Sequence, residues 1–164
     1  MIALHWDTEI RASAERVFAL LAELRDYDRW LPGSSAFHGT SSISAGPIGV
    51  GTTYVEPGPF GVRHGKVTEF VPPTRLAFEQ PMTLRPAAMG MIGIRLSMSL
   101  MPGADGVHVR RELQLDPQGP VKLVMPLVLR AFRAENARMM RVLKDYAERA
   151  ENAASSAQEK TGRR

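Results

Sequence analysis

The 164-residue chain contains no cysteine and no long apolar run. Without cysteine it can form neither a disulfide nor a thiolate metal site. No apolar stretch approaches the roughly 20 residues that a membrane-spanning helix needs. Residues 1–7 also lack the basic segment, apolar core and small-residue cleavage site of a secretory signal. We therefore expect a cytoplasmic protein without a membrane-spanning helix.

The usual catalytic and cofactor motifs are missing as well. The four histidines show no helical pairing around a glutamate, so no zinc-protease motif exists. Gly-Val-Gly at 49–51 lacks the rest of a dinucleotide-binding fingerprint and precedes a predicted strand. No phosphate-binding lysine follows a glycine loop, and no Gly-x-Ser-x-Gly elbow is present. The sequence therefore identifies no catalytic residue and predicts neither a metal nor a cofactor.

The chain is basic, with a net charge of +4 and a calculated isoelectric point near 9.8. A nucleic-acid-binding protein would gather its Lys and Arg side chains on one face. Here bases alternate with acids near the C-terminus, as in Arg133 with Glu135 and Lys144 with Asp145. This pattern is typical of a solvated helix face. We expect no nucleic-acid partner.

A hydrophobic content of 44% with 23% charged residues is that of a soluble globular protein. The length is close to that of one ordinary domain. We predict a single domain over residues 1–152. Residues 153–164 have nothing apolar to bury beyond a few alanines, so we expect a mobile C-terminal tail there.

The first thirty residues predict a strand and two short helices. Residues 2–11 alternate between apolar and polar side chains, which favours a strand. Ser13 then offers a helix N-cap, and an apolar stripe follows that includes Val17 and Leu21. Asp26 can cap a second short helical turn over 27–31, which Pro32-Gly33 ends.

From residue 35 onward, glycine and proline divide the chain into about six strand-sized pieces. The clearest are 92–100 and 107–115, which alternate well enough to have one apolar face each. Arg111 falls on the apolar face of the second. A buried arginine needs a partner or a ligand.

The longest predicted helix comes last. Pro120 suits a first helical position, and no glycine follows until after Glu151, where we expect the helix to end. Phe132, Met139, Val142, Leu143 and Tyr146 are spaced for a buried stripe. Pro126 indicates either a kink or a separate first piece. The order of elements predicts an α+β fold with a curved antiparallel sheet of about seven strands around this helix, enclosing a pocket.

Four segments then resemble the START and polyketide cyclase/dehydrase-like (SRPBCC) superfamily. These are 10–21, 27–33, 49–54 and 69–78, within a similarity that covers about residues 2–150. The resemblance implies a helix-grip fold. It also implies a cavity between the sheet and the last helix that holds an apolar or amphipathic molecule such as a lipid, sterol or polyketide.

Strand parity indicates which side chains face such a cavity. In residues 62–71, Lys66 and Thr68 suit water, so Arg63 and Glu69 are expected on the inner face and His64 outside. An outward His64 is a poor candidate for acid–base catalysis. The best inner polar pair is Glu56 or Glu69 with Arg111, while Arg63 is a second cation for Glu56. The alternative for such a pair is a plain ion pair at the open end of the sheet.

The residues expected to bind the ligand come from the short helices, the strands and the last helix of the predicted fold. They are Trp30, Tyr54, Glu56, Glu69, Phe78, Leu96, Met98, Arg111, Met125 and Phe132. The inward place of Tyr54 rests on the resemblance. The nine methionines are suited either to lining an irregular pocket or to filling a core.

The stretch Leu123–Leu129 is apolar all round, unlike a helix with one wet face. Three explanations stay open. It is sealed beneath loops such as 57–61, it gates the cavity, or it touches a membrane or a second subunit.

Three function classes follow. The first is binding, with or without transfer, of a hydrophobic small molecule. The second is a polyketide cyclase or dehydratase type of enzyme, and the third is a protein-interaction module with a filled core. The expected partner is a hydrophobic small molecule, with transient membrane contact and a monomer or homodimer left open.

Overall fold

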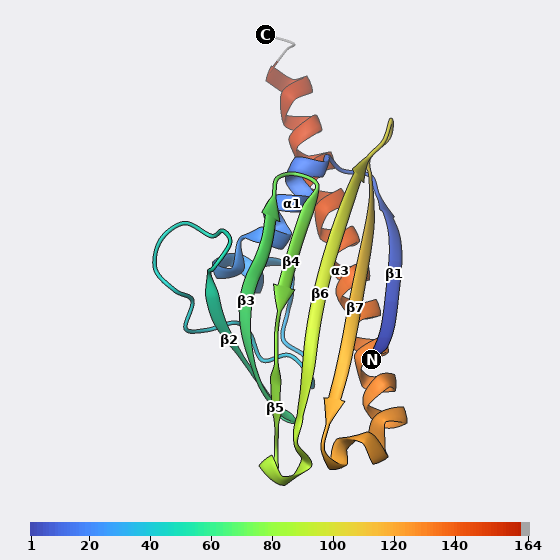
Figure 1. The fold of residues 1–164 in the computed structure, drawn as a ribbon. Helices are drawn as coiled ribbons and strands as arrows, with labels where there is room; N and C mark the ends of the chain where they lie inside the picture. Colours follow the sequence, from blue (N-terminus) through green and yellow to red (C-terminus); the bar gives the residue numbers. More distant parts are fainter. Residues whose placement is uncertain (162–164) are drawn as a thin grey trace.

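The computed structural model describes residues 1–161 and shows one sheet that curves around a long C-terminal helix (Figure 1). The strands are β1 (Ile2–Ile10), β2 (Thr53–Gly58), β3 (Gly61–Val71), β4 (Arg75–Glu79), β5 (Met82–Leu84), β6 (Met91–Pro102) and β7 (Val107–Gln118). The α-helices are α1 (Ala14–Ala22), α2 (Tyr27–Trp30) and α3 (Met125–Thr161), and the short 3₁₀ helices are η1 (Leu24–Asp26), η2 (Ala87–Met89) and η3 (Pro120–Val124). The predicted α+β helix-grip fold is confirmed.

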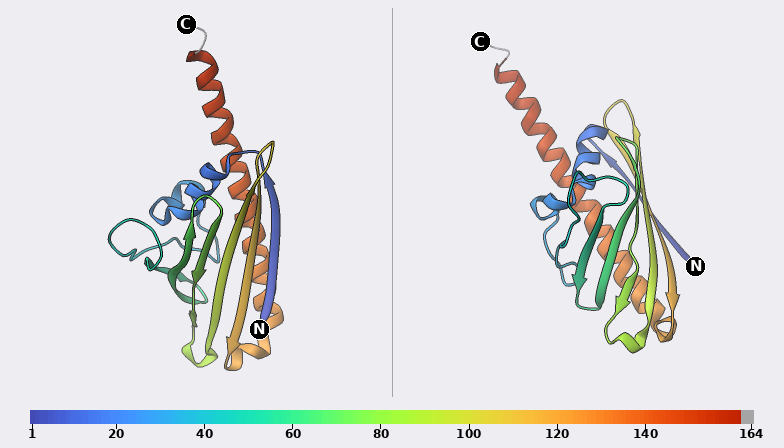
Figure 2. Two further views of the ribbon diagram at one scale, coloured as in Figure 1. Left: turned by 45° about the horizontal axis from the view of Figure 1, so that its top comes forward. Right: turned by 60° about the vertical axis from the view of Figure 1, so that its left-hand side comes forward.

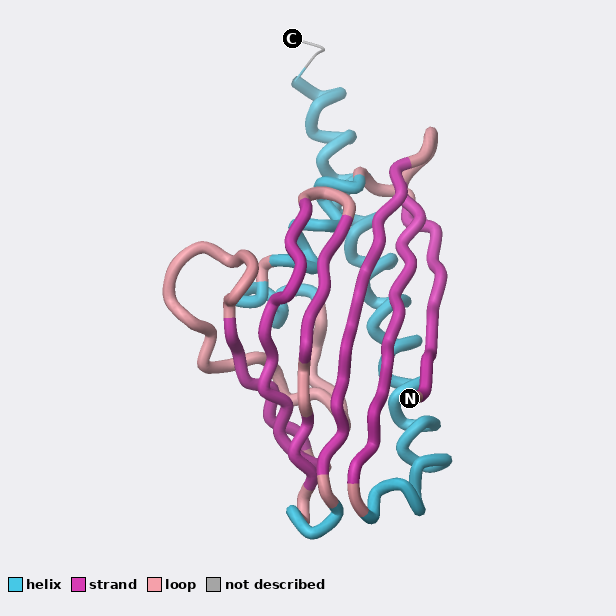
Figure 3. The backbone as a smooth tube through the Cα atoms, viewed as in Figure 1, coloured by secondary structure: helices cyan, strands magenta, loops and turns pink. Residues whose placement is uncertain are grey.

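The strands run in the order β1-β7-β6-β4-β3-β2, all antiparallel, and β5 pairs with both β3 and β6. Figure 2 shows α3 on one side of this sheet, crossing it diagonally. A long connection, 31–52, loops out beside β2 (Figure 3). Antiparallel strands joined by short turns bury one face and leave the other in water.

The short N-terminal helices form largely as the sequence predicts. The Ser13 hydroxyl accepts a hydrogen bond from the Arg16 amide at 3.2 Å and so caps α1. Asp26 makes no side-chain capping bond, so that prediction is wrong. α2 is instead held by the Tyr27 hydroxyl, which donates to the Leu21 carbonyl at 2.6 Å.

The space between the sheet and the middle of α3 is filled with side chains. The inward residues of β6 are buried against those of α3, among them Leu96 and Met98 from the strand and Met139 and Leu143 from the helix. Each fully buried aliphatic side chain contributes about 1.5–3 kcal/mol. This part of the molecule is a packed core.

β3 departs from simple alternation at one point. Its pairing with β4 shifts between Val67 and Glu69, which is a β-bulge. Before the bulge, Val67 faces inward as predicted. After it, Phe70 turns inward, with its ring 5.3 Å from that of Phe18, and Glu69 turns outward to pair with Arg75 at 3.0 Å. The prediction that Glu69 faces the cavity is therefore wrong.

A separate short 3₁₀ helix, η3, precedes the C-terminal helix. Of the two alternatives for Pro126, a kink or a separate first segment, the structure therefore shows the second. Pro120 begins η3, and Pro126 lies in the first turn of α3, where its missing amide is not needed. α3 continues to Thr161, so the expected end near Glu151 is wrong. Residues 153–161 are exposed except for the half-buried Ala154, but Ala, Glu, Lys and Gln among them favour helix without packing. The rest of the predicted tail, 162–164, lies outside the described residues.

Within residues 1–161, no helix combines the length and the apolar character needed to cross a lipid bilayer.

Candidate functional site

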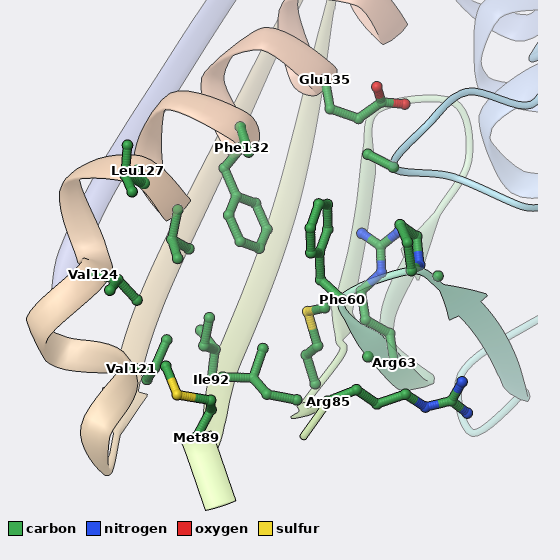
Figure 4. Close-up of a pocket in the computed structure, with 18 of the residues that line it drawn as sticks. Phe60, Arg63, Arg85, Met89, Ile92, Val121, Val124, Leu127, Phe132 and Glu135 are labelled. Atoms are coloured by element: carbon green, nitrogen blue, oxygen red, sulfur yellow. The ribbon is translucent and has the colours of Figure 1, made fainter. Parts of the chain in front are cut away.

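A cavity of about 330 Å³ lies at the end of the grip where α3 begins. It is bounded by η3 and the first turns of α3 on one side and by the β2–β3 turn, β5 and the start of β6 on the other. Figure 4 shows Phe132 from α3 and Phe60 from the β2–β3 turn pointing into it from opposite sides. Its volume is within the roughly 300–1,000 Å³ range of small-molecule pockets.

Most of the cavity wall is apolar. The apolar side chains that line it include Phe60, Met82, Leu84, Met89, Ile92, Val121, Val124, Leu127, Val128 and Phe132. Met82 and Met89 thus line the cavity, whereas Met98, Met139 and Met140 belong to the core. An apolar wall of this kind favours a ligand with an apolar body.

Apart from Arg85, the polar side chains that line the cavity lie together at its inner end. Glu56 forms an ion pair there with Arg63, at 3.1 Å between Oε2 and Nε, and its other oxygen accepts a hydrogen bond from the Thr40 hydroxyl at 3.3 Å. The prediction that Arg111 pairs with Glu56 is wrong. Arg63, named as the second cation, takes that role because β2 and β3 place these two residues directly opposite each other.

Glu135 comes to the same end from α3. Its carboxylate accepts hydrogen bonds from the Ser34 hydroxyl at 3.1 Å and from Arg138 at 2.7 Å. Burial disfavours the charged form, but the hydrogen bonds from Arg138 and Ser34 outweigh it and lower the pKa of Glu135. Glu135 is therefore ionised at neutral pH.

Arg111 is buried directly behind this polar end. Its Nε donates to Oδ1 of Asn136 at 2.7 Å, and its Nη1 lies 3.5 Å from the Met98 sulfur. No carboxylate among residues 1–161 forms an ion pair with it. Burial lowers the pKa of Arg111 to about 10, so the guanidinium keeps its charge at neutral pH.

Asn136 separates Arg111 from the cavity, which it lines. Because arginine only donates, Oδ1 must face Arg111, and Nδ2 then donates to the Phe132 carbonyl at 2.8 Å. One N–H of the Asn136 amide is left for another acceptor.

The structure brings only some of the predicted site residues to the cavity. Glu56 and Phe132 line it, and Arg111 lies one layer behind. The others do not reach it: Trp30, Tyr54, Phe78, Leu96, Met98 and Met125 are buried in the core, and Glu69 is on the outer face.

Tyr54 packs in the core instead of lining the cavity. Its ring lies across Gly65 of β3, where a Cβ would be 2.1 Å from the ring, and meets Phe78 edge-on at 6.0 Å. Its hydroxyl accepts a hydrogen bond from the Gln80 amide. Burial raises the pKa of Tyr54, so the phenol is neutral. The ring fills the space that the sequence-based prediction left for ligand.

Several lining residues were missed from the sequence. Phe60 and Leu127 line the cavity but are not among the predicted ligand-binding residues, although gating of the cavity is one of the three explanations for the stretch that contains Leu127. Asn136 offered a clearer signal. It stands four residues after Phe132 on the buried stripe of the helix, where a polar side chain needs a partner.

The lining residues include no His, Ser, Thr, Tyr or Lys, and both carboxylates are ion-paired. His64 is exposed on the outer face, as predicted. In the part of the chain that the structure describes, no three His, Cys, Asp or Glu side chains are placed to hold a metal ion. The arrangement is suited to binding and orienting a molecule at its oxygen atoms.

A family model described as polyketide cyclase / dehydrase and lipid transport matches residues 1–148. None of the curated proteins matches the sequence closely enough to count as a relative.

Solved structures match over most of the chain. Norcoclaurine synthase from Thalictrum flavum is 19% identical, with a TM-score of 0.66 over 88% of this chain and 92% of the other. The Aha1 protein from Colwellia psychrerythraea, solved as a dimer, is 19% identical, with a TM-score of 0.63 over 90% and 97%. The di-domain ARO/CYC protein BexL of the BE-7585A biosynthetic pathway is 15% identical, with a TM-score of 0.68 over 90% of this chain and 50% of BexL. At these identities the likeness is one of fold.

Proposed function

Because the chain belongs to the polyketide cyclase/dehydrase and lipid transport family, we propose that its cavity binds an amphipathic small molecule. The ligand has an apolar body and, at one end, a carboxylate or carbonyl oxygen. This is a binding or carrier function, and it needs no chemistry from the protein.

The apolar walls supply the affinity in this proposal. Burying an apolar surface stabilises a complex by roughly 25 cal/mol per Å². Phe60 and Phe132 point into the cavity from opposite sides and offer large flat surfaces to a chain or a ring. Met82 and Met89 adapt to the shape of whatever is bound.

The observation that carries the proposal is the charge at the inner end of the cavity. Arg111 is a buried cation without a carboxylate among the residues described, and Arg63 pairs with Glu56 through its Nε. With Glu56 the only anion of this group, the three side chains leave one positive charge uncompensated. A buried charge is costly unless it is balanced, so we expect an anionic or strongly polar oxygen of the ligand at this end, beside Arg63 and the Asn136 amide that line the cavity.

A cyclase or dehydratase is the second candidate, and the family description favours it. Glu56 and Glu135 are the groups that would act on such a substrate. Each already forms an ion pair with an arginine, and the lowered pKa of Glu135 makes it a weak proton donor at neutral pH. The cavity also speaks against the third class, an interaction module with a filled core.

Native mass spectrometry of the gently purified protein, followed by denaturing extraction, tests the proposal. We expect a reproducible mass excess that extracts as an acidic or carbonyl-bearing lipid or aromatic compound. A bare mass that does not shift with decanoate or with a panel of lipids and polyketides would contradict it. Turnover of an extracted compound on return to fresh protein would favour the enzyme.

A further inference from the structure

The cavity opens at an end of the molecule that exposes large apolar side chains. We call this the open end and define it by three segments: residues 57–62, 82–91 and 117–131. Leu123 is 86% exposed, Leu127 71% and Phe60 60%. Figure 1 places β5, η2, η3 and the start of α3 together at the bottom of the molecule.

Backbone contacts join the three segments into one surface. The Arg85 amide donates to the Phe60 carbonyl at 2.9 Å, which ties the turn after β5 to the β2–β3 turn. Gly90, at φ +96°, lies so close to Gln118 that a Cβ there would be 2.1 Å from its carbonyl oxygen. The apolar side chains are therefore held in place relative to one another.

The charges of the open end have one sign. Its three segments carry Arg85, Lys122 and Arg130 and contain neither Asp nor Glu. All three basic residues are exposed, and Figure 4 shows Arg85 pointing away from the cavity. The surface thus combines protruding aliphatic groups with basic ones at the entrance of a ligand cavity.

We propose that the open end docks on the surface of an anionic lipid bilayer. Leu123 and Leu127 insert among the lipid chains, Phe60 borders the cavity entrance beside them, and the basic side chains meet the lipid phosphates. Val124 and Leu127 both line the cavity and border this surface, so a ligand passes between bilayer and cavity without crossing water. The inference rests on the proposed function for its purpose, but docking is measurable without any cavity ligand.

The charge of the open end also argues against a second copy of the chain as its partner. A symmetric dimer through the open end would bring Lys122, Arg85 and Arg130 against the same residues of the other copy. The open end has no acid to pair with them. An acidic protein would satisfy the charges but would give the protruding Leu123 and Leu127 no specific role.

Vesicle sedimentation tests the docking. Wild-type protein is mixed with phosphatidylcholine vesicles with and without phosphatidylglycerol. We expect it to sediment with the anionic vesicles and the bound fraction to fall with added salt. Leu123→Asp should weaken binding about tenfold or more, because it removes an inserting side chain and adds repulsion. Lys122→Gln should weaken it less.

Two matched variants serve as controls. Val50→Asp changes an apolar residue that is 67% exposed but lies outside the open end, and Lys66→Gln changes an exposed lysine on the outer face of β3. Both should bind anionic vesicles like the wild type. Equal loss in Val50→Asp and Leu123→Asp, or no sedimentation of the wild type, would overturn the proposal. So would a wild-type dimer that Leu123→Asp converts to a monomer.

Titration with decanoate in the absence of vesicles separates this inference from the proposed function. Leu123 does not line the cavity, so Leu123→Asp should bind decanoate like the wild type. If the wild type binds anionic vesicles but does not bind decanoate, the result would contradict the proposed function and leave the docking proposal standing.

Discussion

Arg111 on β7 and Asn136 on α3 are joined by a buried hydrogen bond of 2.7 Å that connects the sheet to the helix behind the cavity. The bond fixes the Asn136 amide and leaves the guanidinium without a carboxylate among the residues described. Together these two residues define the polar end of the cavity as a place for an electron-rich oxygen.

Arg111→Met should lower the affinity for decanoate about tenfold, equivalent to about 1.4 kcal/mol. The variant removes the uncompensated positive charge and frees the Asn136 amide to turn. Because a buried cation is costly to the folded protein, its stability should not fall. Fluorescence titration and urea unfolding measure the two quantities.

Arg110→Met is the matched control, since Arg110 lies next along β7 but points outward to Glu112 at 2.8 Å. It should leave decanoate binding unchanged. If Arg111→Met also binds decanoate like the wild type at unchanged stability, Arg111 has no part in the site.

Ala131→Trp should abolish ligand binding by filling the cavity, because Ala131 lines it from an exposed position on α3. Ala134→Trp places the same side chain on the same helix at an exposed position outside the lining. It should bind normally. Displacement of an environment-sensitive fluorophore by decanoate distinguishes the two variants, and equal binding by both would place the ligand elsewhere.

Gly65→Ala should destabilise the protein by about 2 kcal/mol, since the new Cβ would overlap the Tyr54 ring. Gly93→Ala is the comparison, because a Cβ at Gly93 lies at an ordinary 3.5 Å from Asp116 on the outer face. It should be neutral or slightly stabilising. Urea unfolding midpoints measure both, and a destabilised Gly93→Ala would mean that the outer face is more tightly packed there.

Most of the fold could be predicted from the sequence because local patterns determine it. Alternation over 92–100 and 107–115 marked β6 and β7 and placed Arg111 on the buried face. The bulge after Val67 could not be read from alternation, since it depends on how β3 pairs with β4, and it reversed the face of Glu69. The extension of α3 to Thr161 could not be predicted from an apolar stripe, because its last turns are largely exposed and depend on helix propensity alone.

The position of the cavity was harder to predict. Tyr54 and Met98 face inward as expected, yet packing between sheet and helix leaves no room beside them. The cavity lies where η3 and the β2–β3 turn meet, and residues distant in the sequence, such as Phe60, Val121 and Ile92, line it together. Of the three explanations for the apolar stretch after Pro120, sealing beneath loops is contradicted by the exposure of Leu123 and Leu127.

The outer face carries a pH-dependent contribution to stability. His108 lies between Glu9 at 2.5 Å and Asp7 at 2.8 Å, and its hydrogen bonds to Glu9 and then Asp7 raise its pKa in the folded state. The stabilisation is complete below the unfolded-state pKa of about 6.5 and is lost as the pH rises through the raised folded-state value. His108→Gln should therefore lower the unfolding free energy at about pH 6 and match the wild type at about pH 9.

His64→Gln is the control for this effect, since His64 is exposed and forms no ion pair with the residues described. Its unfolding free energy should differ from that of the wild type equally at both pH values. A His108→Gln effect that does not depend on pH would contradict the assignment, as would an NMR titration of the His108 ring that shows no upward shift.

Calorimetric titration of the wild type with decanoate, decanol and decylamine tests the central claim most directly. The three molecules share one apolar chain and differ only in the head group, so the apolar wall contributes equally to each. The positive polar end formed by Arg63 and Arg111 predicts that decanoate binds most tightly and decylamine most weakly. Equal affinities, or tightest binding of decylamine, would contradict it.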